Sequence, residues 1–73
     1  MTFTQKQAAV IALLRANPGG LTVAEIGWRT NELAGETRAR LHALKRHGLV
    51  TNDGQRPARW RMRLVMDYLE APA

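Results

Sequence analysis

The period of the hydrophobic pattern changes once along this chain, at Gly48. Before Gly48, apolar residues recur three and four positions apart, which places them on one face of an α-helix. Beyond it, over Ala58 to Leu64, apolar and basic residues alternate as in a β-strand with one buried face. A chain of 73 residues can support only one core. We therefore expect one α+β domain over residues 1–73, mainly helical, with a β-hairpin near its C-terminal end.

Threonines mark the starts of the first two helices. Thr4 is followed by Gln7, and Thr22 by Glu25, at the spacing of a capping box. A third apolar stripe at helical spacing ends at Gly48, a residue type that commonly closes helices. The expected helices span residues of about 4–16, 23–30 and 35–47.

A two-stranded hairpin is expected after the third helix, over residues 49–64. Leu49 can contact Leu44, as in the Schellman motif that ends many helices. Asn52-Asp53-Gly54 is a strong turn signal. In the second strand, one face would carry Trp60, Met62 and Leu64, and the other Arg59, Arg61 and Arg63. A short fourth helix over residues 65–70 is a further expectation.

Positive charge is concentrated in the second half of the chain. The net charge is +5, but residues 38–63 alone hold eight Lys and Arg and one acid, a local charge of +7. Such segregation is typical of a face that binds a polyanion. The alternative is a solvated surface that keeps a small protein soluble.

The third helix has an unusually slender side opposite its apolar stripe. Gly35, Ala39 and Ala43 lie there, with basic residues along the edges. This side could enter the major groove of duplex DNA, where Arg pairs with guanine and Lys or Arg contacts phosphate. The same small residues could instead allow another helix to pack closely.

Trp28 does not fit the apolar stripe of the second helix. It lies two residues after Ile26 and so points about 200° away from the buried side. Either another segment, such as the C-terminal tail, covers Trp28, or Trp28 is exposed for a partner. The pattern favours packing, because large exposed aromatic residues are uncommon.

The segment from Leu21 to Ile26 resembles the start of helix 2 in winged helix-turn-helix DNA-binding domains. The segment from Thr37 to Val50 is similar to their recognition helix running into the wing, including the closing Gly48-Leu49-Val50. The resemblance implies a three-helix winged helix-turn-helix with a two-stranded wing. It also implies a double-stranded DNA partner and the role of a small transcriptional regulator.

The resemblance assigns contacts to individual residues. The candidates for contact with base edges are Arg38, His42 and Arg46. The candidates for contact with the DNA backbone are Arg40, Lys45, Arg56, Arg59 and Arg61. Glu36, at the front of the recognition helix, either accepts from cytosine N4 or complements the positive helix terminus.

Pro57-x-x-Trp60 also resembles the wing of domains that bind left-handed Z-form nucleic acid. That family carries Asn and Tyr at the sites of Arg38 and His42. The departure argues against Z-form recognition, so we expect Trp60 to anchor the wing to the core.

The sequence gives no support for catalysis, a cofactor or a metal site. His42 and His47 point about 140° apart on one helix, so they do not form a ligand pair. The chain has no cysteine, and its apolar runs are too short for a membrane span, so we expect a cytoplasmic protein. An alternative to DNA binding is a protein-interaction module that docks a partner through Trp28 and the C-terminal helix with Tyr68. Homodimer formation is left open.

Overall fold

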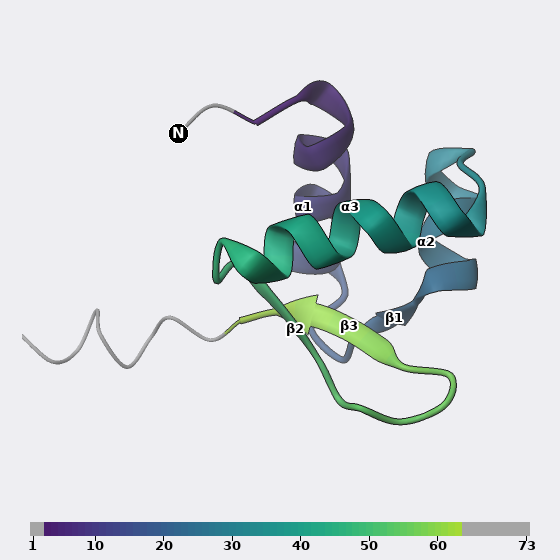
Figure 1. Ribbon diagram of the computed structural model, residues 1–73, viewed down its shortest axis with the longest axis vertical. Coiled ribbons are helices and arrows are strands. Elements are labelled where there is room, and N and C mark those ends of the chain that lie inside the picture. Colours follow the sequence, from purple (N-terminus) through teal and green to yellow (C-terminus); the bar gives the residue numbers. More distant parts are fainter. Residues whose placement is uncertain (1–2, 64–73) are drawn as a thin grey trace, which may run out of the picture.

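The structure, a computed structural model, describes residues 3–63. Three helices pack around a small antiparallel sheet, and α3 runs across the centre of the molecule above β2 and β3 (Figure 1). The elements in chain order are α1 (Gln5–Ala16), β1 (Leu21–Thr22), α2 (Val23–Thr30), α3 (Ala34–Arg46), β2 (Val50–Asn52) and β3 (Arg59–Met62). The expected fold, a mainly helical α+β winged helix-turn-helix, is confirmed. The expected fourth helix over 65–70 and Tyr68 lie outside the described residues.

Both predicted capping boxes are present. The Gln7 N–H donates to Thr4 Oγ1 at 3.1 Å, and the Thr4 N–H donates to Gln7 Oε1 at 3.0 Å. The corresponding distances between Thr22 and Glu25 are 3.2 and 2.8 Å. In each box two backbone N–H groups that the helix leaves unpaired are satisfied, which is why α1 and α2 begin where the sequence predicts. The third helix differs, because its N-cap, Leu33, makes no side-chain cap hydrogen bond.

The end of α3 is the predicted Schellman motif. The Leu49 N–H donates to the Leu44 carbonyl at 3.1 Å, and the Gly48 N–H donates to that of Lys45 at 2.9 Å. Gly48 has a φ of +78°, in the region where a side chain would be strained. The chain therefore turns sharply from α3 into β2.

The sheet has three strands rather than the expected two. β3 lies in the middle, with β1 on one side and β2 on the other, and Leu21 is paired with Trp60. The sequence pattern did not reveal β1, because two residues are too few to show a period. The close approach depends on Gly20, where a Cβ atom would lie 3.2 Å from the Trp60 carbonyl oxygen.

The core is drawn from every helix and every strand. Its buried apolar side chains are Val10, Ile11, Leu14, Leu21, Ile26, Leu41, Leu44, Val50 and Trp60. Trp60 is 3% exposed, so its expected role as the anchor of the wing is confirmed. Because Trp60 belongs to β3, its burial fixes the position of the wing against the helices.

Candidate nucleic-acid interface

A groove lies between the start of α2, one side of α3 and the wing, which comprises β2, β3 and the loop between them. Ala24 of α2, Arg38 and His42 of α3, and Pro57 and Trp60 of the wing are among the residues that line it. We refer to it as the α3 groove. The capping box of α2, the Schellman turn after α3 and the buried Trp60 together hold these three elements in place.

His42 and Trp60 meet at the base of the α3 groove. Their ring centroids are 5.1 Å apart and the rings are nearly perpendicular, at 88°. This edge-to-face geometry is favourable for aromatic pairs. Trp60 is buried while His42 is exposed, so the imidazole is held by the core and still accessible from outside.

The structure brings together two of the three predicted base-edge candidates. Arg38 and His42, one turn apart on α3, both line the α3 groove. Arg46 is exposed in the last turn of the same helix but is not among the lining residues. Lys45 and Arg56 are also exposed, the first on α3 and the second in the wing loop. Ala24 and Asn52 also line the groove; the sequence marked Asn52 as part of the wing turn, and no sequence pattern pointed to Ala24.

Arg40 lies on another side of α3, towards α1. Glu32 Oε1 is 3.4 Å from an Arg40 guanidinium nitrogen and 3.0 Å from Lys6 Nζ. The Arg40 side chain is only 17% exposed. These contacts give Arg40 a structural role between α1 and the start of α3.

Glu36 also faces α1 rather than the α3 groove. It lines a shallow hollow with residues of α1 and its cap, such as Thr4 and Gln7. A hydrogen bond between the Glu36 and Glu32 carboxyl groups raises the pKa of Glu36 and lowers that of Glu32. The position of Glu36 in the first turn of α3 suits the favourable interaction of an acid with a helix N-terminus, and gives no support for a contact with cytosine.

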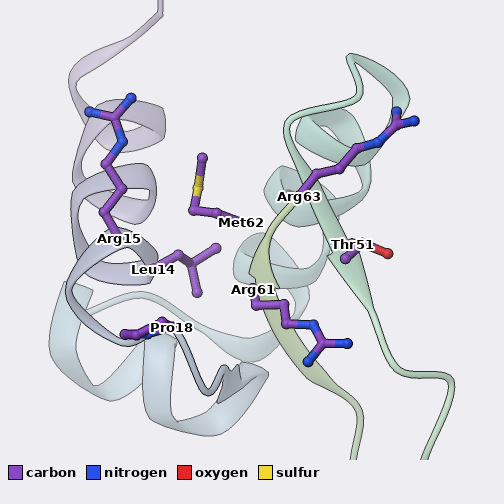
Figure 2. A pocket seen from close by; sticks show the side chains of 7 residues that line it. All are labelled: Leu14, Arg15, Pro18, Thr51, Arg61, Met62 and Arg63. Carbon is purple, nitrogen blue, oxygen red and sulfur yellow. The ribbon is translucent and has the colours of Figure 1, made fainter. Parts of the chain in front are cut away.

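The arginines of β3 are exposed, as the alternation predicts, but they do not act together. The Arg59 guanidinium donates to the Gly20 carbonyl at 3.1 Å, which ties β3 to the turn before β1. Arg61 is paired with Thr51 of β2 and lines a second hollow, beside α1, with Arg15 and Arg63. Figure 2 shows these three arginine side chains pointing in different directions.

Asp53 organises the loop of the wing. Its Oδ1 accepts hydrogen bonds from the backbone N–H groups of Gln55, at 2.9 Å, and Arg59, at 3.1 Å. Those two bonds are the main reason that the pKa of Asp53 is lowered. The sequence marked Asp53 only as part of a turn. In the structure it fixes the loop that carries Arg56 beside the α3 groove.

Trp28 is 87% exposed, so none of the described segments covers it. The C-terminal tail, which was one expected cover, lies outside the described part of the chain. Among residues 3–63, no three His, Asp or Glu side chains are grouped so that they could hold a metal ion. In the same range no helix has the length and apolar character that a membrane crossing requires.

A sequence comparison identifies the family of this domain. Residues 4–54 match the IclR helix-turn-helix domain. The chain belongs to the IclR helix-turn-helix domain family. The expected membership in the winged helix-turn-helix domains is thereby confirmed. A search of curated proteins found no match.

Solved structures show the same fold as this IclR-type domain. The Zα domain of PKZ from Carassius auratus, solved in complex with Z-DNA, superposes with a TM-score of 0.76 at 24% identity, covering 80% of this chain and 92% of the Zα chain. A point mutant of MepR from S. aureus superposes with a TM-score of 0.77 at 23% identity, covering 94% of this chain. The IclR-type chain spans 55% of the MepR chain. At these identities the likeness concerns the fold.

Proposed function

We propose that this IclR-type domain binds double-stranded DNA and acts as a small transcriptional regulator, with α3 in the major groove. The observation that carries the proposal is the separation of charge around α3. Arg38 lines the α3 groove, and Lys45 and Arg46 are exposed on the same helix. The two acids nearest to α3, Glu32 and Glu36, are turned towards α1.

In this arrangement Arg38 and His42 contact base edges. A guanidinium can donate two hydrogen bonds to guanine, and an imidazole can donate to or accept from a base. Arg46 is the third base-edge candidate, two turns further along α3. Lys45 and Arg56 contact phosphates, where they contribute affinity without reading sequence.

We assign other roles to three arginines that the resemblance places on the DNA backbone. Arg40 is paired with Glu32, and Arg59 is bonded to the Gly20 carbonyl, so we assign both to the fold. Arg61 lies beside α1, outside the α3 groove. We assign to Arg61 only a contribution to the long-range attraction of DNA.

A second candidate ligand is left-handed DNA, because the Zα domain was solved with Z-DNA. The observation that favours it is the perpendicular contact of His42 on Trp60, in a groove that Pro57 also lines. We place the right-handed duplex first, because Arg38 is too long and too strongly charged to substitute for the Asn of the Z-form binders.

The first test is a fluorescence-anisotropy titration with three probes: a random-sequence duplex, a single strand, and a CG-repeat duplex held in the left-handed form. The proposal predicts that the right-handed duplex binds most tightly. Tighter binding of the left-handed duplex would support the second candidate. No preference for either duplex over the single strand would contradict the proposed function.

The matched variants are Arg38→Ala and Arg15→Ala, which remove the same charge from two exposed positions. Arg38 lines the α3 groove, whereas Arg15 is on α1 beside the second hollow. Arg38→Ala should weaken duplex binding by about 1–3 kcal/mol, and Arg15→Ala should change it far less. Equal losses in the two variants would show that only total charge matters.

A further inference from the structure

Trp28 and Leu33 are the exposed large apolar side chains of the described residues, at 87% and 73% exposure. Trp28 lies in the second half of α2, and Leu33 is the N-cap of α3. A Trp side chain with this exposure loses the free energy that burial would provide. An exposed position of this kind therefore suggests a contact with another molecule.

The direction of Trp28 follows from that of Ala24. The two residues are four positions apart on α2, so they lie on the same face, about 6 Å apart along the helix axis. Ala24 lines the α3 groove together with Ala34, the residue that follows Leu33. Trp28 therefore lies one helical turn beyond the lining of this groove, on the face of α2 that carries Ala24.

The charges near Trp28 fit an anionic neighbour. Arg29 is the next residue and is exposed. Glu25, one turn before Trp28, has its carboxylate turned back to accept from the Thr22 N–H at 2.8 Å. Arg38 lies across the same groove on α3. Arg38 thus shares this groove with a Trp whose ring can donate one hydrogen bond and accepts none, while the Arg29 charge is shared with the nearby Glu25 carboxylate.

We infer that Trp28 is part of the nucleic-acid interface and that its indole N–H donates to a phosphate oxygen of the strand beside the α3 groove. This inference rests on the proposed function. In helix-turn-helix domains the helix before the recognition helix crosses the DNA backbone, which brings the exposed face of α2 close to phosphates. The contact explains why a large apolar residue is left uncovered on α2: its ring lies against the sugar edge of the strand and its N–H reaches the phosphate.

The first experiment compares duplex binding by Trp28→Phe, Trp28→Ala and the unchanged protein. A hydrogen bond to a charged group is worth enough that its loss should weaken binding about tenfold. Trp28→Phe keeps an apolar ring but has no N–H, so it should show this tenfold loss, and Trp28→Ala, which also lacks the ring, should lose at least as much. Both variants should keep the unchanged protein's melting temperature, because Trp28 is exposed.

Fluorescence quenching by acrylamide gives an independent readout. The protein has two Trp residues, of which Trp60 is buried and Trp28 is exposed, so quenching of the free protein should come mainly from Trp28. Addition of the random duplex should protect this signal. In Trp28→Phe, which retains only Trp60, the duplex should change the quenching little.

The outcomes separate this inference from the proposed function. If the unchanged protein binds the duplex but Trp28 stays open to acrylamide and both variants bind normally, the inference is overturned and the proposed function stands. Light scattering could instead show a dimer that Trp28→Ala dissociates. Trp28 would then belong to an interface between two copies of the chain, and the inference would also be overturned. If the unchanged protein binds no duplex, both fail.

Discussion

Gly27 is the residue on which the crossing of α2 and α3 depends most. A Cβ atom at Gly27 would lie 2.8 Å from the Glu32 backbone carbonyl oxygen and 3.3 Å from Thr37 Oγ1. The backbone oxygen cannot move aside as a flexible side chain could. Thr37 is itself fully buried, and its hydroxyl has no hydrogen-bond partner among the described residues, so this contact has no room for another atom.

Gly27→Ala should therefore lower the free energy of unfolding by about 1–3 kcal/mol, since overpacking forces the backbone to shift. The measurement is urea denaturation followed by circular dichroism. Gly35→Ala is the matched control, because a Cβ there would meet nothing within 4 Å. That control should gain about 0.5–1 kcal/mol from its better helix propensity. If both changes stabilise the protein, the close approach between Gly27 and the Glu32 carbonyl oxygen is contradicted.

Residue contacts within one turn of chain were predictable from the sequence, and distant ones were not. The caps at Thr4 and Thr22 belong to the first group, because each partner lies three positions away. The bond from Arg59 to Gly20 joins residues 39 positions apart, and no local pattern contains it. The outward direction of Trp28 followed from helix geometry, whereas the segment expected to cover it, the C-terminal tail, lies outside the described residues.

At the scale of elements, α3 differs from the other helices in its start. Leu33 provides no side-chain cap, so backbone N–H groups in the first turn lack the partner that a Ser or Asp would provide. Leu33→Ser should raise the free energy of unfolding by about 1 kcal/mol. Leu33→Ala, which shortens the side chain without adding a cap, should have little effect because Leu33 is exposed. Thermal melts that show equal shifts for the two variants would contradict this view of the α3 start.

The contact between α1 and α3 should respond to pH through Glu36. The folded state raises the pKa of Glu36 above its ordinary value of 4.5, mainly through the hydrogen bond with Glu32. Protonated Glu36 is therefore favoured by folding, and its stabilising contribution is present below pH 4.5 and lost as the pH rises through the raised pKa.

Glu36→Gln keeps a hydrogen-bond donor at this position at every pH, so the stability of this variant should not fall as the pH rises through the Glu36 pKa. The expected result is a variant whose melting temperature, relative to the unchanged protein, improves as the pH rises from acidic to neutral. The pKa of Glu32 is lowered in the folded state. Protonation of Glu32 therefore destabilises the fold as the pH falls below 4.5, which is opposite in sign to the effect of Glu36. Parallel pH profiles for the two proteins would show that the carboxyl groups are not coupled.

The elements themselves were largely predictable, and the sheet was not. Each helix lies within about a residue of its expected range, because its caps and stops are local signals. The strand β1 contains two residues and exists through its pairing with β3, a tertiary contact. For the α3 groove, the side formed by Arg38 and His42 was predictable, because both lie on one helix. The side formed by Ala24 was not, because it depends on how α2 packs against α3.

At the scale of the whole molecule, exposed basic residues accompany the α3 groove. The basic segment from residue 38 to residue 63 carries a net +7, and the structure separates four of its eight cations from the rest, of which Arg61 and Arg63 line the second hollow. Arg38, Lys45, Arg46 and Arg56 are exposed on α3 and the wing loop, and we propose that they meet DNA. Arg40 and Arg59 are held by the fold. We therefore expect about four cations, rather than eight, to displace counterions when the domain binds.

The slope of log affinity against log salt concentration for a random duplex tests this central claim most directly. On a random duplex Arg38 and Arg46 meet no matching base, so we count them with Lys45 and Arg56 as phosphate contacts. Four such cations correspond to a slope of about −3.6, because each contributes about −0.9. The triple variant Arg38→Ala, Lys45→Ala, Arg56→Ala should flatten the slope to about −1, while Arg15→Ala should leave it unchanged. A slope that is near zero in the unchanged protein, or the same in the triple variant, would contradict the assignment of this face to DNA.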